Sequence, residues 1–597
     1  MEQCTKSPPG SLGASLDYQP VELKFGTSGR RGEVVHLTQL EVYINAMAEI
    51  EYLLSLPKDR GGIRIGQNFY VGHDLRPSST RFVPEQGGRG EIAQAIISAV
   101  SDAGLRPVNL GAIPTPALAY YALLEGCGSI MVTGSHIPFD RNGYKTYSAK
   151  GELRKEDEEP INARVNEVRR RVYGQSLAES KFNPKGMLKT GHVELPKAQT
   201  DWKQIYANRY YDFFCGTTTG ATTKRPLESV LAGLRVLVYE HSAVGREILA
   251  DILSSFGADV ARAGRSEQFV PIDTENFDAN LAATIEKLAA EAWSKHGRID
   301  AVVSTDGDSD RPLVIGVEPF SSPNTPCRIR FFGGDLVGMV TAEFLKPDAV
   351  VVPISCNDGI DLGPLRHVVR PKTRIGSPYV IAGMEQARNL GCRAVCGFEA
   401  NGGFLVGTDI QHDHGLLRAL PTRDAVLPIL CVLARAREER VSLSELFAKL
   451  PPRFGKAALL KQFPRARGRA IIQRLSPARL EICDVFFVDG ELRCVGSNNQ
   501  HVEATAEDKA RLAQIRAVLS ELFNSKLGFG PITRINYIDG VRIWFGNGDI
   551  AHVRPSGNAD ELRIYAVANT PERADAITDM AVREPDGILR HMERALT

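Results

Sequence analysis

The amino-acid sequence predicts an α/β protein with three related α/β domains, whose sheets are mixed or parallel, and a C-terminal α+β domain. Strand-like and helix-like segments alternate in three successive rounds, a pattern typical of parallel sheets with crossover helices. After residue 441 the pattern changes to strands of the antiparallel type. At 597 residues the chain is long enough for about four domains.

The three rounds have similar internal order. In the first we predict strand 69–72, helix 91–100, strand 108–111, helix 116–124 and strand 129–132. In the second we predict strand 234–239, helix 245–256, strand 258–261, helix 279–296 and strand 299–303. In the third we predict strand 349–354, helix 380–390 and strand 393–396. In the C-terminal part we predict strands 485–488 and 541–545 and helices 504–523 and 571–582.

These elements give the expected domain boundaries. We expect a mobile tail at 1–20, α/β domains at 21–173, 204–316 and 317–450, and an α+β domain at 451–597. Residues 174–203 and 464–476 lack clear periodicity and are predicted to be surface insertions.

Bulk composition excludes several classes of protein. Lys and Arg total 72 and Asp and Glu total 71, so the formal charge is 72 − 71 = +1, and no basic block supports binding to nucleic acid or to a membrane surface. The ten cysteines have neither disulfide-framework nor zinc-site spacing, which favours a reducing, cytoplasmic compartment. No stretch of about 18 apolar residues predicts a membrane span.

The most informative motif is Thr-Gly-Ser-His-Ile-Pro at 133–138, followed by Asn-Gly-Tyr-Lys at 142–145. It follows the buried strand 129–132, so it should start at the carboxyl edge of a sheet, where open α/β folds bind ligands. The hydroxyl of Ser135 is therefore the predicted chemical centre.

A second loop carries three carboxylates, Asp306, Asp308 and Asp310, directly after strand 299–303. In an extended segment the positions i, i+2 and i+4 point to one side and converge on a hard cation, for which an all-oxygen site favours Mg²⁺ over Zn²⁺. The twelfth position counted from Asp306 is Val317, which argues against an EF-hand, and a solvated acidic turn is the remaining alternative.

Three further loops carry residue types that suit a sugar phosphate. Residues 397–404 contain Glu399 and Asn401, an acceptor and an amide for neighbouring hydroxyls, although an ordinary turn would look the same. Residues 554–563 place a Ser-Gly-Asn turn between Arg554 and Arg563, as in a phosphate cradle. Residues 25–32 form a glycine-rich cationic loop that by itself could be any flexible turn.

In this order, the loops resemble those of the α-D-phosphohexomutase family over most of the chain, from about residue 21 to the C-terminus. The resemblance also covers Gly-Thr-Ser-Gly-Arg-Arg-Gly at 26–32, Gly-His-Asp-Leu-Arg-Pro-Ser-Ser at 72–79 and Thr-Arg-Ile-Gly-Ser at 373–377. It implies four domains in a heart-shaped arrangement around one cleft, and it implies the following residue roles. Catalytic residues are Ser135, Lys145, His136 and Arg31; metal ligands are Ser135, Asp306, Asp308 and Asp310; substrate-binding residues are Arg311, Arg374, Gly376, Ser377, Glu399 and Asn401; phosphate-binding residues are Arg554, Ser556, Gly557, Asn558 and Arg563.

The resemblance also implies a mechanism. Ser135 would be active as phosphoserine with Mg²⁺ as cofactor, and hexose 1,6-bisphosphate would be the intermediate and activator. Lys145 is the favoured general acid/base because it lies ten residues beyond Ser135 in the same loop and a cationic neighbourhood could lower its pKa, with Arg31 and His136 as competitors.

Within the family, Glu-Ala-Asn-Gly-Gly at 399–403 and Arg-Pro-Ser-Gly-Asn-Ala at 554–559 are similar to bacterial-type phosphomannomutases, so mannose phosphate is the first choice of substrate. Relatives acting on glucose or glucosamine phosphates have Glu-x-Ser and a nearby His, where this chain has Asn401 and Gly403. Phosphoglucomutase and phosphoglucosamine mutase activities therefore stay open, as do a phosphatase and a non-catalytic sugar-phosphate sensor. We expect no nucleic-acid or membrane partner, and a monomer or small homo-oligomer.

Overall fold

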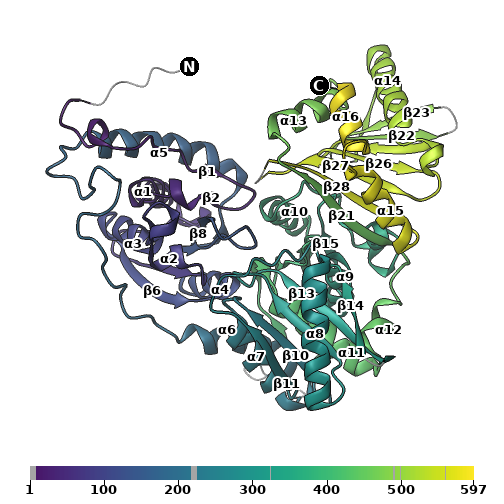
Figure 1. The fold of residues 1–597 in the computed structure, drawn as a ribbon, viewed down its shortest axis with the longest axis horizontal. Coiled ribbons are helices and arrows are strands. Elements are labelled where there is room, and N and C mark those ends of the chain that lie inside the picture. Colours follow the sequence, from purple (N-terminus) through teal and green to yellow (C-terminus); the bar gives the residue numbers. More distant parts are fainter. Residues whose placement is uncertain are drawn as a thin grey trace. The chain divides into compact units, whose positions relative to one another are not determined.

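The computed structural model describes residues 8–216, 225–322, 325–413, 415–488, 491–497, 499–557 and 560–596. The chain divides into two compact units. Unit 1 comprises residues 1–334 and 402–443, and unit 2 comprises residues 335–401 and 444–597. The colours of Figure 1 follow the chain through both units, from the purple N-terminal domain to the yellow C-terminal one.

The first sheet of unit 1 has seven strands in the order β1-β2-β8-β7-β3-β6, with β9 paired to β8. The strands are β1 (Lys24–Phe25), β2 (Arg30–Glu33), β3 (Asn68–His73), β6 (Arg106–Ala112), β7 (Ser129–Val132), β8 (Arg141–Ser148) and β9 (Gly151–Glu152). β3 is parallel to β6 and β7, whereas β8 is antiparallel to β7 and β2. The sheet is therefore mixed, with a parallel centre as predicted.

Helices cover both faces of this sheet. Side chains alternate along each strand, so successive residues pack against helices on opposite faces. Phe69 and Val71 of β3 share one apolar core with α1, α3 and α5. Tyr70 points the other way, where its ring centroid lies 5.1 Å from that of Tyr121 in α4. The helices are α1 (Gln39–Ser55), α2 (Pro77–Thr80), α3 (Ile92–Asp102), α4 (Thr115–Glu125) and α5 (Glu158–Tyr173).

Two segments expected at the surface pack against this domain. Within the predicted N-terminal tail, Leu12 is fully buried in the core. Within the predicted insertion 174–203, Phe182 is buried and packs edge-on against Tyr43 of α1. The same insertion is tied down where the amide of Asn109 donates to the carbonyl oxygen of Pro196, 2.7 Å away. It is thus a strap over the domain that leads into α6 (Trp202–Cys215).

The second sheet of unit 1 follows the order β11-β10-β12-β13-β14. Its strands are β10 (Arg235–His241), β11 (Asp259–Arg265), β12 (Ala301–Thr305), β13 (Pro312–Ser322) and β14 (Thr325–Phe332). β10 is parallel to β11 and β12, and the last three strands are antiparallel. Helix α7 (Arg246–Ser255) contacts β10, and the long α8 (Ala279–His296) lies across the sheet (Figure 1).

The third α/β region is built partly in each unit. In unit 2, β15 (Ala349–Val351) is parallel to β16 (Val395–Phe398), with α9 (Gly334–Leu345) and α10 (Ser377–Asn389). In unit 1, β17 (Phe404–Val406) is antiparallel to β20 (Leu420–Asp424), which leads into α11 (Val426–Glu439). The short pairs β4 (Phe82–Val83) with β5 (Arg89–Gly90) and β18 (Ile410–Gln411) with β19 (Leu416–Leu417) complete unit 1.

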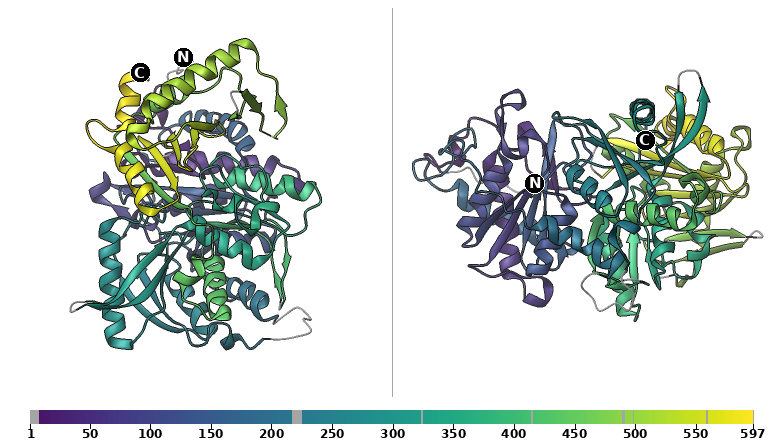
Figure 2. Two further views of the ribbon diagram at one scale, coloured as in Figure 1. Left: turned by 90° about the vertical axis from the view of Figure 1, so that its right-hand side faces the viewer. Right: turned by 90° about the horizontal axis from the view of Figure 1, so that it is seen from below.

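The C-terminal domain has an eight-stranded antiparallel sheet in the order β21-β28-β27-β26-β25-β22-β23-β24. Its strands are β21 (Phe454–Lys461), β22 (Asp484–Val488), β23 (Glu491–Val495), β24 (His501–Val502), β25 (Ile532–Asn536), β26 (Val541–Phe545), β27 (Ile550–Pro555) and β28 (Glu561–Ala568). Helices α13 (Arg465–Arg474), α14 (Ala506–Leu522), α15 (Pro571–Val582) and α16 (Ile588–Leu596) contribute to its apolar core, and the long α14 runs beside the sheet (Figure 2). Helix α12 (Leu443–Phe447) precedes this domain.

The fold class and most elements are confirmed, but two further expectations are wrong. Residues 464–476 are largely helical, because Pro464 caps the start of α13 and the buried Ile471 joins the C-terminal core. Lys145 does not lie in the serine loop but on β8, opposite Met131 of β7, because residues 141–148 form the return strand of a hairpin. Within the described residues, no helix is long and apolar enough to cross a membrane.

Candidate active site

Ser135 lies just beyond the carboxyl end of β7, as predicted. Its backbone has φ +54°, a left-handed conformation that is uncommon for serine and occurs mostly in tight turns or functional loops. Its backbone N–H donates to the Thr133 hydroxyl at 2.7 Å, and its own hydroxyl donates to Asp306 Oδ2 at 2.7 Å. The ring of His136 is a weaker neighbour, with Nδ1 3.4 Å from Ser135 Oγ. The hydroxyl is therefore held toward the aspartate loop.

A buried arginine that sequence reasoning did not select, Arg76, fixes the shape of the serine loop. Its guanidinium donates to four carbonyl oxygens of the loop, those of Ser135, Ile137, Pro138 and Arg141. Four carbonyl groups turned toward one planar cation define the path of the chain around Ser135. Burial lowers the Arg76 pKa to about 10, which still leaves the group charged at neutral pH.

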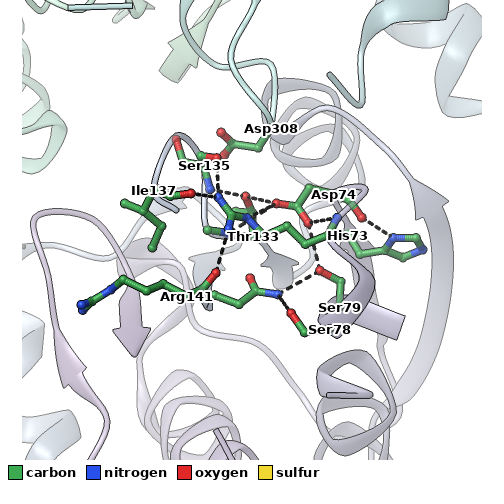
Figure 3. Close-up of polar contacts among 12 residues, drawn as sticks. His73, Asp74, Ser78, Ser79, Thr133, Ser135, Ile137, Arg141 and Asp308 are labelled. Atoms are coloured by element: carbon green, nitrogen blue, oxygen red, sulfur yellow. Dashed lines mark hydrogen bonds and ion pairs between the residues drawn. The ribbon is translucent and has the colours of Figure 1, made fainter. Parts of the chain in front are cut away.

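Asp74, two residues before this arginine, holds the base of the same loop (Figure 3). Its carboxylate accepts hydrogen bonds from the hydroxyls of Thr133 (2.8 Å) and Ser79 (2.9 Å) and from the backbone N–H of Gly134 (3.3 Å). A Cβ atom at Gly134 would lie 2.5 Å from the guanidinium carbon of Arg76, so only glycine fits there. The motif at residues 72–79 thus supports the serine loop.

The three aspartates after β12 converge, but through a turn and not through an extended segment. Asp306, Asp308 and Asp310 each offer a carboxylate oxygen within 4.8 Å of the others, and all three are buried. Between them Ser309 has φ +60°, and its hydroxyl accepts the backbone N–H of Gly245 at 2.9 Å. The predicted cluster is present, although the alternation argument gave the wrong backbone.

Strand alternation brings two predicted cations to one face of the first sheet. On β2 and β8, Arg30 and Tyr144 turn toward α1, where both contact Glu49. The next residue on each strand, Arg31 or Lys145, points to the opposite face. Lys145 Nζ donates to Asp308 Oδ2 at 2.7 Å and to Asp310 Oδ2 at 2.6 Å.

Arg31 lies beside the serine loop. Its guanidinium donates to the carbonyl oxygen of Thr133, two residues before Ser135. Removal from water lowers the pKa of this arginine, an effect that the Asp308 carboxylate opposes.

Two arginines complete the surroundings of the aspartates. The Arg311 Nε atom lies 3.9 Å from Asp306 Oδ2 and 3.7 Å from Asp310 Oδ1. Arg423, on β20, donates from Nε to Asp310 Oδ2 at 3.0 Å. Sequence reasoning missed Arg423 because it lies 113 residues from Asp310 in a segment without a motif.

The pKa values of the aspartates differ although the residues lie close together. Burial, together with the neighbouring Asp308 and Asp310 charges, raises the pKa of Asp306 well above its usual value. Burial alone would also raise the pKa of Asp308, but Lys145 and Thr115 outweigh burial and hold that pKa far below its usual value. A cation bound beside Asp306 would favour the charged form of this carboxyl group.

The aspartate oxygen atoms that accept no hydrogen bond fit a divalent cation. Asp308 Oδ2 accepts hydrogen bonds from Lys145 and from the hydroxyl of Thr115. Asp310 Oδ2 accepts hydrogen bonds from Lys145 and from the guanidinium of Arg423. Their Oδ1 atoms are buried and accept no hydrogen bond from the described residues. Buried carboxylate oxygens are costly when unpaired, and hard oxygen ligands suit Mg²⁺. We conclude that the residues present form a metal-binding site.

Unit 2 carries the predicted sugar-binding residues. Glu399 and Asn401 follow β16 and are 3% and 4% exposed, so neither belongs to a solvated turn. Gly376 and Ser377 are at the start of α10, and the φ of +126° at Gly376 requires glycine. Arg374, just before them, is exposed.

Unit 2 also carries the predicted phosphate loop. Arg554 on β27 lies directly opposite Arg563 on β28, so the two cations are cross-strand neighbours. Between them the N–H of Ser556 donates to the carbonyl oxygen of Glu561 at 2.9 Å and closes the turn. Gly557 is exposed, and Asn558 lies outside the described residues.

Asp539, which sequence reasoning missed, connects the phosphate loop to the loop at residues 373–377. Its Oδ1 accepts a hydrogen bond from Arg554 Nε at 3.2 Å, and its Oδ2 accepts the backbone N–H of Ile375 at 3.0 Å. The turn Asn-Tyr-Ile-Asp-Gly at 536–540, which contains Asp539, carries no sequence signal for this role. The connection exists only because β26 and β27 form a hairpin.

Comparison with known proteins assigns these features to one family. Family models described as phosphoglucomutase/phosphomannomutase α/β/α domain I, α/β/α domain III and C-terminal domain match residues 22–171, 333–454 and 501–584. A phosphomannomutase of Sinorhizobium fredii is 35% identical over 552 residues, which cover 92% of this chain and 96% of that protein. A phosphomannomutase of Salmonella muenchen is 34% identical over 559 residues, which cover 93% of this chain and 94% of that protein.

Solved structures agree with the fold. A phosphoglucomutase/phosphomannomutase family protein of Burkholderia thailandensis has a TM-score of 0.59 at 16% identity, covering 97% of this chain and 98% of that one. The open form of parafusin, a phosphoglucomutase of Paramecium, has a TM-score of 0.53 at 16% identity and covers 96% of each chain.

Proposed function

Because the chain belongs to the phosphoglucomutase/phosphomannomutase family, we propose that it reversibly interconverts mannose 6-phosphate and mannose 1-phosphate. Family membership makes the protein an isomerase of the phosphohexomutase type. The choice of mannose is supported by two phosphomannomutases at 35% and 34% identity over more than nine-tenths of the chain. The alternatives are phosphoglucomutase and phosphoglucosamine mutase activity.

The observation that carries the proposal is the position of the Ser135 hydroxyl. It is buried, 2.7 Å from Asp306, in a loop whose path four hydrogen bonds from Arg76 define. A sensor that only binds sugar phosphates has no use for a serine fixed against three carboxylates. This arrangement therefore favours catalysis over binding alone.

In the proposed reaction Ser135 carries a phosphoryl group on Oγ. The bond between Oγ and phosphorus breaks while phosphorus bonds to the free hydroxyl of a hexose phosphate, giving hexose 1,6-bisphosphate. The hydroxyl proton leaves to a base, for which Lys145 in its neutral form is the proposed group and His136 and Arg31 are alternatives, and Ser135 Oγ takes up a proton as it leaves phosphorus. The bisphosphate then reorients in the site and returns its other phosphate to Ser135. The net reaction therefore moves phosphate between carbons 6 and 1.

Asp306, Asp308 and Asp310 would hold Mg²⁺, which when bound would neutralise phosphoryl charge. The buried cations Lys145 and Arg311 supply further positive charge beside Ser135, and phosphoryl transfer depends mainly on such positioning and charge. In unit 2, Glu399 and Asn401 are proposed to bind sugar hydroxyls. Arg554 and Arg563 are proposed to bind the phosphate that is not reacting.

The test is phosphorus NMR of the purified protein with Mg²⁺ and a trace of hexose 1,6-bisphosphate. Mannose 1-phosphate, glucose 1-phosphate and glucosamine 1-phosphate are supplied separately. Formation of mannose 6-phosphate at the highest rate is the expected result, and a faster reaction of another sugar would reassign the substrate. Release of inorganic phosphate would indicate a phosphatase, and no conversion of any sugar would contradict the enzymatic proposal.

A further inference from the structure

Arg423 on β20 contacts a proposed metal ligand in an asymmetric way. Its Nε and Nη2 atoms lie 3.0 Å and 2.9 Å from the same oxygen, Asp310 Oδ2. The other carboxylate oxygen, Oδ1, accepts no hydrogen bond from the described residues and has Arg311 Nε 3.7 Å away. Lys145 donates to the same Oδ2 atom at 2.6 Å. A carboxylate with all its donors on one oxygen can turn only its other oxygen toward a cation.

The backbone beneath Arg423 is fixed by the residue that follows it. Asp424 points to the opposite face of β20, where it accepts hydrogen bonds from the hydroxyls of Tyr206 (2.9 Å) and Tyr210 (2.8 Å) and from the guanidinium of Arg209 (3.0 Å). These three donors all belong to α6, and all are buried. A fully paired buried carboxylate of this kind is rigid, so the backbone from which the Arg423 side chain extends is held in place.

Gly403 leaves the space that the Arg423 side chain needs. A Cβ atom at residue 403 would lie 2.4 Å from Cδ, 2.6 Å from Cγ and 3.0 Å from Cβ of Arg423. Contacts this short with the stem of a buried side chain cannot be relieved at its tip, so the whole side chain would have to move. Alanine at residue 403 would therefore displace the guanidinium from Asp310 without removing any charge.

From these contacts we infer that Arg423 is a positioning residue for the metal site, and that Gly403 is required because its lack of a side chain lets Arg423 reach Asp310. Residues that orient the ligands of a metal commonly change its affinity by 10- to 100-fold when they are lost. The inference rests on the proposed function for the identity of the site. It adds two residues to which no role in that function has been given above.

Charge and geometry make opposite predictions for this arginine. A guanidinium near a cation repels it, so a residue acting by charge alone would weaken metal binding, and its removal would strengthen binding. If Arg423 instead acts by keeping Asp310 Oδ1 free for the metal ion, its loss should weaken metal binding. Variants that keep the charge and lose the geometry separate the two effects.

The experiment is a titration of the full-length protein with Mn²⁺ alone, followed by electron paramagnetic resonance of the free ion. For Gly403→Ala and for Arg423→Lys we expect the Mn²⁺ Kd to rise about tenfold. Arg418→Lys on the same segment, an exposed arginine paired with Asp409, is the matched control and should leave the Kd unchanged. Wild-type Kd values in both Gly403→Ala and Arg423→Lys, or tighter binding in Arg423→Ala, would overturn the inference.

A double-mutant cycle guards against simple misfolding. In the Arg423→Ala background the Cγ and Cδ atoms that a new Cβ would meet at 2.6 Å and 2.4 Å are gone and only Cβ, 3.0 Å away, remains, so the further change Gly403→Ala should alter the Kd by less than about twofold. Equal losses from Gly403→Ala with and without Arg423 would contradict the coupling. Because no sugar phosphate is present, intact coupling in a protein that lacks mutase activity would count against the proposed function only.

Discussion

The hydroxyl of Ser135 lies 2.7 Å from a carboxylate oxygen of Asp306, although 171 residues separate the two along the chain. The serine follows the last parallel strand of the first sheet, and the aspartate follows the corresponding strand of the second. Gly307 permits the approach, since a Cβ atom there would lie 2.8 Å from the carbonyl oxygen of Ser135. This contact joins the proposed phosphate carrier to the proposed metal site.

Replacing Ser135 by alanine should abolish phosphoryl transfer. With no oxygen to carry the phosphoryl group, we expect mutase turnover to fall on the order of 10⁴-fold or more. The expected readout is the absence of the 80 Da mass increase, about that of one phosphoryl group, after incubation with hexose 1,6-bisphosphate. His136→Ala is the comparison, since it keeps the hydroxyl and should still be phosphorylated; turnover by Ser135→Ala would exclude the phosphoserine.

Lys145→Ala should slow transfer and make stability depend more strongly on metal. The loss of a proton donor or acceptor costs about 10²- to 10⁴-fold in kcat, whereas substrate binding should change little. The variant also leaves two buried carboxylates, Asp308 and Asp310, without their shared ammonium, which costs about 3 kcal/mol or more without metal. Lys150→Ala, at an exposed site near the end of β8, is the control.

The metal dependence can be measured by thermal unfolding with and without Mg²⁺. A cation at 100 times its Kd stabilises the folded protein by about 2.7 kcal/mol. We expect the transition that includes unit 1 to rise on addition of Mg²⁺ in the wild type, and to rise further in Lys145→Ala. Asp308→Asn should lose most of this response, and an unchanged response in that variant would contradict the assignment of the ligands.

Arg554→Gln and Arg563→Gln should raise KM for the hexose phosphate more than they lower kcat. A hydrogen bond to a charged group contributes about 1.5 to 3 kcal/mol, which corresponds to roughly 10- to 150-fold in KM. Arg469→Gln, an exposed arginine on α13, is the matched control. If both variants of the arginine pair had wild-type KM and reduced kcat, the pair would act on the reacting phosphate and not on the distal one.

Acid pH should destabilise the C-terminal domain through His552. Burial, with a further contribution from Arg542, lowers the His552 pKa from 6.5 to about 3 in the folded protein. The unfolded chain therefore binds the proton first, and stability is complete above pH 6.5 and is lost as the pH falls toward 3. From pH 7.5 to pH 5 we expect a loss of about 2 kcal/mol from this group.

The measurement is chemical denaturation at both pH values, monitored by tryptophan fluorescence, to which Trp544 of this domain contributes. His552→Gln, which cannot be protonated in this range, should reduce the difference between the two pH values by about 2 kcal/mol. His501→Gln, at an exposed position of the same domain, is the control and should leave the difference unchanged. An equal difference in His552→Gln would show that another group is responsible.

The sequence by itself determined the fold class, the order of the helices and strands in the three α/β rounds, and the loops at which chemistry was expected. These follow from local properties: apolar periodicity marks strands and helices, and polar motifs after buried strands mark ligand-binding edges. Ser135 and the three aspartates could be selected because their residue types and spacing are unusual in short segments.

Only the tertiary structure decided which side chains work together. Arg423 and Asp539 lie in no motif, and Arg76 and Thr115 were given no role from the sequence, because each of the four acquires its contact through pairing between segments distant in the sequence. The backbone at Asp306, Asp308 and Asp310 could not be predicted, because a left-handed residue at Ser309 is stabilised by hydrogen bonds to other segments. Long-range packing, which local pattern does not encode, fixed the orientation of every carboxylate in the site.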